Sequence, residues 1–169
     1  IFKKKSLKKI FYKYIDIKEI FVEESKKFIL KNFQEKKTLG VYLRDGEFRS
    51  IPGHALPPSD KQIVNNVKKI FKEGNYQKIF LCSKEISHLN IFKKHFDKLF
   101  VTYDSFRSLE DCFVTYPRKN HRYLLGAEIL IESLILSQLD GLIFSLSNVS
   151  SSAVFFNLNP IQERSMIDN

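Results

Sequence analysis

The sequence predicts an α/β domain with a parallel β-sheet between layers of helices, and three observations support this fold class. Short apolar segments alternate along the chain with longer segments of helical periodicity, which is the order of β-α-β units. The segments LFVTY and GLIF are apolar almost throughout, as in strands that are buried on both faces. The 169 residues, with 16 Phe and seven Tyr, are enough for one domain with a real core. We therefore expect a Rossmann-like sheet of at least four strands.

The elements follow in order along the chain. Apolar residues at helical spacing predict a helix over 17–35, and LGVYLR predicts a strand over 39–44. Residues 45–59 are rich in Pro and Gly and predict a long loop, after which Ser59 or Asp60 caps a helix that continues to about Lys72. We expect three further strands, over 78–82, 99–103 and 141–144. Two further helices are predicted over 83–96 and 124–139, with an irregular segment over 104–121 between them. A last helix begins near Val149, and residues 155–158 are its end or a short strand.

The strand predicted over 141–144 leads directly into a hydroxyl-rich turn. This turn holds Ser145, Ser147, Asn148, Ser150 and Ser151. Ligands of open α/β sheets bind beyond the carboxyl ends of the strands, and the free N–H groups at a helix start suit a phosphate. Ser and Asn are also ordinary N-caps of helices. An anionic, nucleotide-like ligand and simple capping are both open interpretations of this segment.

A cation and two candidate acid–base groups follow the first predicted strand. Arg44 ends that strand, and an Arg at a buried position needs an anion, either the phosphates of a ligand or an acid such as Asp45. Glu47 is either an acid–base group or the partner of Arg44. His54, in the loop PGHALPPS, either binds substrate or packs within the loop.

Three carboxylates belong to the last helix–strand unit. Glu128 and Glu132 are four residues apart and share one face of a helix that is otherwise apolar. A carboxylate there either receives the N–H edge of guanine or lies on the solvated side of the helix. Asp140 comes before the last core strand, where we expect it to hold a loop or a cap rather than a ligand.

Several classes of site are disfavoured by the motifs that the sequence lacks. No GxGxxG follows the first strand and no Walker A motif occurs, which disfavours nicotinamide enzymes and P-loop enzymes. The two Cys, Cys82 and Cys112, have no metal or redox spacing, and Cys82 is expected to be a buried thiol. The four His form no HExxH or similar set, so we expect no metal site.

The positive charge is concentrated near the start of the chain. Most of the net charge of +9 lies in residues 1–37, which we interpret as a basic amphipathic helical segment before a domain of residues 38–169. Such a segment either contacts an anionic surface, a membrane or a nucleic acid, or is a solvated helix face. Its aromatic residues fall at helical spacing and no nucleic-acid motif occurs, so we expect no nucleic-acid partner and keep peripheral membrane contact as an alternative.

Several segments, taken together, resemble one known family. LGVYLRDGEF, at 39–48, is similar to the strand and loop written GVHxRxTD in α-1,6-fucosyltransferases, rhizobial nodulation fucosyltransferases and their bacterial relatives. The segments that follow in the family's order are PGHALPPSDKQI, KIFLCSKE, VTYDSFRS and LLGAEILIESLILSQLDGLIFSLSNVSSSAVFFNLNP. The resemblance covers about residues 17–160, and the last segment is its most specific part.

The resemblance implies the C-terminal, donor-binding half of a GT-B-type glycosyltransferase. Such an enzyme transfers fucose from GDP-fucose to a glycan acceptor with inversion, and it needs no metal. Matching positions imply that Arg44 holds the donor diphosphate, that Glu132 meets guanine, and that Ser147 and Asn148 meet the phosphates. N–H groups up to Ser150 would help to stabilise the leaving diphosphate, with Glu47 and His54 as candidate bases. An N-terminal domain outside this chain and a cytoplasmic location, close to the inner face of a membrane, are further expectations.

Some positions depart from the family's pattern. Tyr42 stands in place of the usual His of HxR, and Gly46 and Glu47 stand in place of Thr and Asp. The acidic pair that often follows the second strand reads Ser83-Lys84-Glu85. The alternative function is therefore a catalytically inactive domain of the same fold that binds a nucleotide or a partner.

Overall fold

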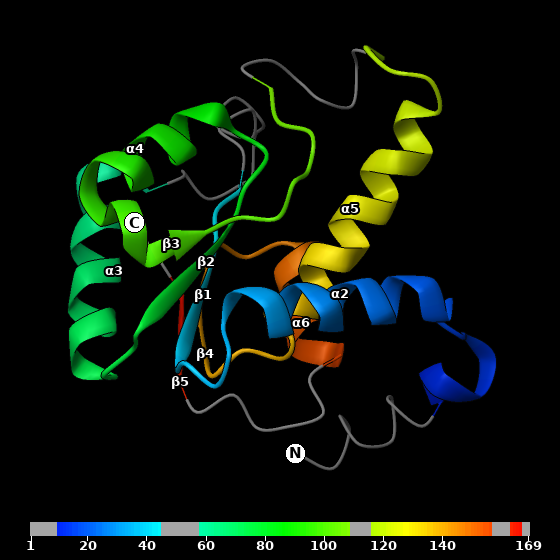
Figure 1. The fold of residues 1–169 in the computed structure, drawn as a ribbon, viewed down its shortest axis with the longest axis horizontal. Helices are drawn as coiled ribbons and strands as arrows, with labels where there is room; N and C mark the ends of the chain where they lie inside the picture. Colours follow the sequence, from blue (N-terminus) through cyan, green and yellow to red (C-terminus); the bar gives the residue numbers. More distant parts are fainter. Residues whose placement is uncertain (1–9, 45–57, 109–115, 157–162, 167–169) are drawn as a thin grey trace.

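The computed structural model describes residues 10–44, 58–108, 116–156 and 163–166. At its centre is a five-stranded sheet in the order β3-β2-β1-β4-β5, and every neighbouring pair is parallel (Figure 1). The strands are β1 (Thr38–Tyr42), β2 (Lys78–Cys82), β3 (Phe100–Val101), β4 (Gly141–Phe144) and β5 (Glu163–Met166). The chain thus builds the sheet outward from β1 in one direction and then, from β4, in the other. The predicted fold class is confirmed.

Helices cover both faces of the sheet. They are α2 (Glu19–Asn32), α3 (Asp60–Glu73), α4 (Ile86–Phe96), α5 (His121–Leu136) and α6 (Asn148–Phe156). Figure 1 shows α3 and α4 on one face, and α2, α5 and α6 on the other. Two core clusters match these two layers, because successive residues of a strand point to opposite faces. Val41, Leu81 and Ile143 pack under α3 and α4, whereas Phe80 and Leu142 pack under α2, α5 and α6.

Most predicted elements appear close to their predicted bounds. β2 and β4 match exactly, and α3 begins after Ser59, which forms the predicted cap as part of a capping box with Gln62. The helix predicted from Ser83 begins only at Ile86. Ser83 instead lies in the connection between β2 and α4. Its hydroxyl accepts a hydrogen bond there from the Glu85 N–H at 3.2 Å. The strand predicted over 99–103 is only two residues long, and α5 begins and ends three residues earlier than predicted.

The segment before β1 packs on the sheet. Phe28 of α2 and Phe33, which follows it, lie against the buried Phe80 of β2, with ring centroids 5.6 and 6.1 Å away. Phe33 is itself only 3 % exposed. Of the aromatic residues at helical spacing, Phe21 and Phe28 therefore pack against the core, whereas Tyr14 is 72 % exposed. Among the described residues, no helix combines the length and the apolar character needed to cross a bilayer.

Asp140 lies at the amino-terminal edge of the sheet, where β1 and β4 begin. Its carboxylate accepts a hydrogen bond from the Thr38 N–H at 2.7 Å, and its own N–H donates to the Thr38 carbonyl at 3.2 Å. Both bonds join the start of β1 to the turn before β4. This is the structural role that the sequence predicted for Asp140.

Candidate functional site

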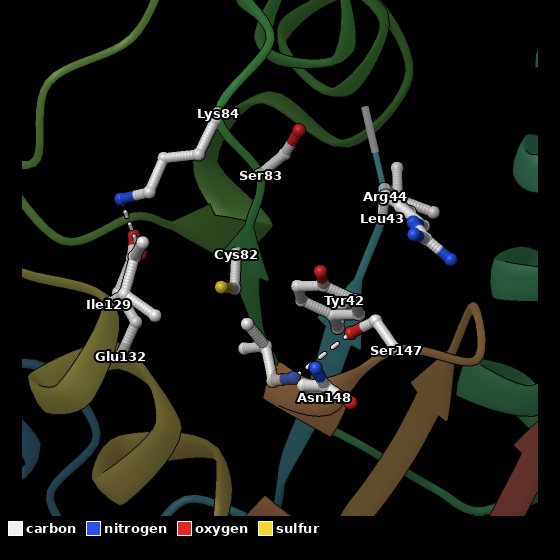
Figure 2. A pocket seen from close by; sticks show the side chains of 11 residues that line it. Tyr42, Leu43, Arg44, Cys82, Ser83, Lys84, Ile129, Glu132, Ser147 and Asn148 are labelled. Carbon is white, nitrogen blue, oxygen red and sulfur yellow. Dashed lines mark hydrogen bonds and ion pairs between the residues drawn. The ribbon is translucent and has the colours of Figure 1, made fainter. Parts of the chain in front are cut away.

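A pocket of about 230 Å³ lies beyond the carboxyl ends of β1, β2 and β4. The topological switch point of the sheet lies between β1 and β4, where the strand order reverses. Ligands of open α/β sheets bind at such a point, beyond the carboxyl ends of the strands. The pocket is lined by Tyr42, Leu43, Arg44, Cys82, Ser83, Lys84, Ile129, Glu132, Ser147, Asn148 and Val149. Most of the predicted site residues therefore lie around one cavity, although they come from four separate parts of the chain (Figure 2).

Arg44 borders the pocket next to the start of α6. It follows the buried Leu43, whose N–H donates to the Cys82 carbonyl at 3.0 Å and so continues the contact between β1 and β2. The Arg44 guanidinium donates to the Leu146 carbonyl at 3.3 Å, in the turn between β4 and α6. This bond directs a permanent cation toward the helix start.

The first turn of α6 is capped by its own hydroxyl groups. Ser147 Oγ accepts hydrogen bonds from the N–H groups of Val149 and Ser150, at 3.1 and 3.3 Å. Ser150 Oγ is fully buried and accepts from the Ser147 N–H at 3.0 Å. The Asn148 N–H has no acceptor among the described residues. Capping accounts for the Ser147 and Ser150 hydroxyls, while Asn148 and the helix dipole remain directed at the pocket.

Glu132 forms a buried polar network in the wall opposite. It is completely buried on α5, and its two carboxylate oxygens accept from Lys84 Nζ at 2.8 Å and from Ser105 Oγ at 2.9 Å. Arg107 lies 3.6 Å from the same carboxylate and donates to the Ser83 carbonyl at 3.0 Å. The network joins β2, the segment after β3, and α5. Of the two positions that the sequence left open for this carboxylate, the structure excludes the solvated one.

Among the described residues, two cations share the one carboxylate of this network. The side chains of Lys84 and Arg107 are only 10 % and 9 % exposed, and they share the one carboxylate of Glu132. The neighbouring Glu128 forms an ion pair with Arg118 instead, and accepts hydrogen bonds from its guanidinium at 2.6 and 2.9 Å. Buried charges are stable when they are paired, so two cations with one carboxylate, in the part of the chain that the structure describes, favour an anionic ligand at this wall. Arg44 adds to this positive field.

The apolar part of the wall includes an inert thiol. Cys82 lies at the end of β2, and it is 2 % exposed. Burial, together with the negative charge of Glu132, raises the pKa of the Cys82 thiol well above its ordinary value. The thiol is therefore neutral at physiological pH, and with Ile129 and Tyr42 it gives the pocket a largely uncharged surface between its two polar ends (Figure 2).

The predicted site residues divide into three groups. Tyr42, Arg44, Glu132, Ser147 and Asn148 line the pocket. Ser150 does not line it, because its side chain turns back under the helix start. Glu47 and His54 lie outside the described residues. Their chemical roles remain predictions.

Three residues of the network, Lys84, Ser105 and Arg107, were not identified as site residues from the sequence, and Lys84 was noted only as a departure from the family's pattern. Ser105 and Arg107 lie in the segment that was expected to be irregular, and only the polar character of that segment signalled them. Tyr103, which follows β3, packs its ring against Phe28 of α2, with the ring centroids 5.4 Å apart. No cluster of three or more metal-ligating side chains occurs in the part of the chain that the structure describes.

Comparison of this architecture with solved structures gives a consistent result. POFUT1 in complex with GDP superposes with a TM-score of 0.58 at 14 % identity, over 87 % of this chain and 46 % of that protein. NodZ α-1,6-fucosyltransferase soaked with GDP-fucose gives 0.56 at 14 % identity, over 87 % and 45 %. Fucosyltransferase NodZ from Bradyrhizobium gives 0.54 at 13 % identity, over 86 % and 44 %.

The chain has the fold of part of a fucosyltransferase. The resemblance that the sequence segments suggested, and the GT-B-like fold class, are thereby confirmed at the level of the fold. The chain spans less than half the length of each of these proteins. No family model matches the sequence, and no curated protein matches it.

Proposed function

We propose that this chain is the donor-binding domain of a glycosyltransferase that transfers fucose from GDP-fucose to a glycan acceptor with inversion. The observation that carries the proposal is the pocket, in which Arg44 and the α6 start meet at the switch point of a fold shared with fucosyltransferases solved with GDP and GDP-fucose. The two cations that share the Glu132 carboxylate among the described residues suit the same anionic ligand.

In this proposal the chain's residues act mainly on the leaving group. An inverting transfer breaks the bond between the sugar and the diphosphate, and negative charge grows on the diphosphate as it leaves. In this proposal the Arg44 guanidinium and the Asn148 N–H stabilise that charge; both residues line the pocket, and Asn148 begins α6 at the positive end of its dipole. Glu47 and His54 are the proposed bases for the acceptor hydroxyl, on sequence grounds alone. An N-terminal domain would complete the cleft and bind the acceptor.

Calorimetric titration with GDP tests the donor site. We expect micromolar binding to the unaltered chain, and a loss of at least about tenfold in Arg44→Ala, because a hydrogen-bonded charge pair to phosphate is worth about 1.5–3 kcal/mol. Arg122→Ala is the matched control, because Arg122 is exposed and donates to the Tyr116 hydroxyl, away from the pocket. Equal GDP affinity in Arg44→Ala and the control would contradict the assignment of Arg44.

A catalytically inactive nucleotide-binding domain is the second candidate, and the Lys84–Glu132 ion pair favours it. This pair occupies the carboxylate that the resemblance assigns to guanine. Turnover separates the two candidates: the protein together with its acceptor-binding domain should release GDP from GDP-fucose only if it is an enzyme. Retained GDP affinity without GDP release would establish the second candidate.

A further inference from the structure

The side chain that a base would meet in this pocket is Lys84, and the carboxylate of Glu132 lies behind it. Glu132 is 0 % exposed and has both oxygens engaged, by Lys84 at 2.8 Å and by Ser105 at 2.9 Å. Lys84 retains about 9 % exposure and lines the pocket. An ammonium group only donates hydrogen bonds, whereas a carboxylate only accepts them. The recognition chemistry at this wall is therefore that of a donor.

The two ends of the pocket have different functions if a nucleotide binds there, and in this respect the inference rests on the proposed function. Figure 2 shows Arg44 on one side of Tyr42 and Cys82, and the Lys84–Glu132 pair on the other. The diphosphate belongs at the end formed by Arg44 and the α6 start, since the positive end of the α6 dipole lies there, with an Asn148 N–H that has no acceptor among the described residues. The base then extends past the apolar surface of Cys82 and Ile129 to Lys84.

We propose that Lys84, held by Glu132, selects 6-oxopurine nucleoside diphosphates by donating to the O6 and N7 atoms of the base, regardless of any 2-amino group. Lysine donates to these two acceptors of guanine in other contexts, because they are adjacent on one edge of the ring. Adenine has an amino group in place of O6, and this donor would face the ammonium donor of Lys84. A carboxylate would read the opposite feature, the N1–H and 2-amino donors of guanine, but Glu132 is not accessible to the base.

Inosine diphosphate distinguishes the two ways of reading the base, because it keeps O6, N7 and N1–H but lacks the 2-amino group. We expect calorimetric titrations of the unaltered chain to give equal affinities for GDP and IDP, within about threefold, and an affinity for ADP that is about tenfold weaker. GDP binding that is tenfold or more tighter than IDP binding would overturn the inference and leave the proposed function standing. No binding of any of the three would overturn both.

Two variants assign the selectivity to Lys84. Lys84→Met keeps an unbranched side chain as far as the ε position but removes the ammonium group, and it should abolish the preference for GDP and IDP over ADP. A uniform loss for all three nucleotides would instead make Lys84 a phosphate ligand and overturn the inference. Glu132→Gln keeps an oxygen that accepts from Lys84, and its NH2 group can donate to the Ser105 hydroxyl, so the preference for GDP and IDP should remain. Loss of the preference would show that the carboxylate itself reads the base.

Controls cover folding and net charge. Lys84→Met leaves Glu132 buried with Arg107 as its remaining cation, so the double variant Lys84→Met/Glu132→Gln, in which no unpaired carboxylate remains, is measured beside it. The double variant should bind the three nucleotides with equal affinity, and a retained preference would overturn the inference. Lys61→Met removes one exposed charge from α3, and it should keep the selectivity of the unaltered chain.

Discussion

The most constrained single residue in the pocket wall is Glu132. A fully buried carboxylate is tolerated here because Lys84 and Ser105 satisfy both of its oxygens. These partners are 48 and 27 residues away in the chain. The sequence placed Glu132 on a helix face with Glu128, but it could not decide between a ligand-facing and a solvated position. That choice depended on Lys84, which the sequence showed only as a departure from a familiar pattern.

Cys82 offers a test of the environment beside Glu132. Burial, and then the charge of Glu132, raise the pKa of this thiol, and the reactive thiolate is correspondingly scarce. In a Cys112→Ser background, which leaves Cys82 as the one thiol of the chain, we expect iodoacetamide to alkylate the native protein at least about tenfold more slowly than the urea-unfolded protein. Mass spectrometry follows the reaction. Equal rates would mean that the thiol is exposed and ordinary.

At the scale of elements, close contacts explain why glycine occupies the start of β4. A Cβ atom at Gly141 would overlap the hydroxyl group and ring of the buried Tyr76, whereas nothing lies within 4 Å of a Cβ at Gly126 in α5. We expect Gly141→Ala to lower the free energy of unfolding by about 1–3 kcal/mol through overpacking. Gly126→Ala should raise it by about 0.5–1 kcal/mol, because alanine favours the helix.

Urea denaturation of the two alanine variants checks this pair of expectations. The Gly141 variant tests the contact with Tyr76, and the Gly126 variant serves as its matched control within the same chain. A Gly141→Ala/Tyr76→Phe double variant should recover part of the loss, since the hydroxyl group is the nearest obstacle. Opposite signs for the two single variants are required; a destabilised Gly126→Ala would contradict the open space around that position.

The segment between β3 and α5 is attached to α5 through Glu128. Partial burial alone would raise the pKa of this carboxyl, but hydrogen bonds from Arg118 and from the Phe106 N–H, and the charges of Arg118 and Lys84, lower it overall. A group with a lowered folded pKa contributes stability above its ordinary pKa of 4.5, and this stability is lost as the pH falls through the folded pKa.

The pH dependence of unfolding therefore reports on Glu128. We expect Glu128→Gln to lose less stability than the unaltered protein as the pH falls from about 7 to about 3, because its amide does not titrate. Urea titrations at several pH values measure this slope. Glu73→Gln, at the exposed end of α3, is the control. If Glu128→Gln and the unaltered protein gave parallel curves, the ion pair with Arg118 would not contribute to stability.

The accuracy of the predicted elements varied with how much apolar signal each carried. β2 and β4 were predicted exactly, because KIFLC and GLIF are apolar runs with clear boundaries. β5 was not predicted, because its sequence ERSM has no apolar pattern, and it becomes a strand by pairing with β4 along the backbone. The first turn of α5 begins HRY and lay before the predicted start of this helix for the same reason. Local sequence does not contain the tertiary pairing that fixes such elements.

At the scale of the whole molecule, the position of α2 relates the basic segment of residues 1–37 to the domain. The distribution of charge predicted a basic segment of residues 1–37 before a domain of residues 38–169. This division remains a prediction. In the structure, Phe33 and Phe28 pack on Phe80 beneath the same sheet that carries the pocket. Aromatic side chains in such contacts contribute both buried area and ring–ring attraction. The helix is thus expected to fold with the sheet rather than as an independent arm.

Two alanine substitutions within this segment test that expectation. Phe33→Ala should lower the free energy of unfolding by about 3–5 kcal/mol, because it leaves a cavity against Phe80. Leu30→Ala, three residues earlier and 72 % exposed, should change it by less than about 0.5 kcal/mol. Urea denaturation measures both, and GDP titration of the Phe33 variant, at a temperature where it is folded, separates stability from binding. If Phe33→Ala were as mild as Leu30→Ala, residues 1–37 would be an attached segment that the domain can lose, and the boundary at residue 38 predicted from charge would be the correct one.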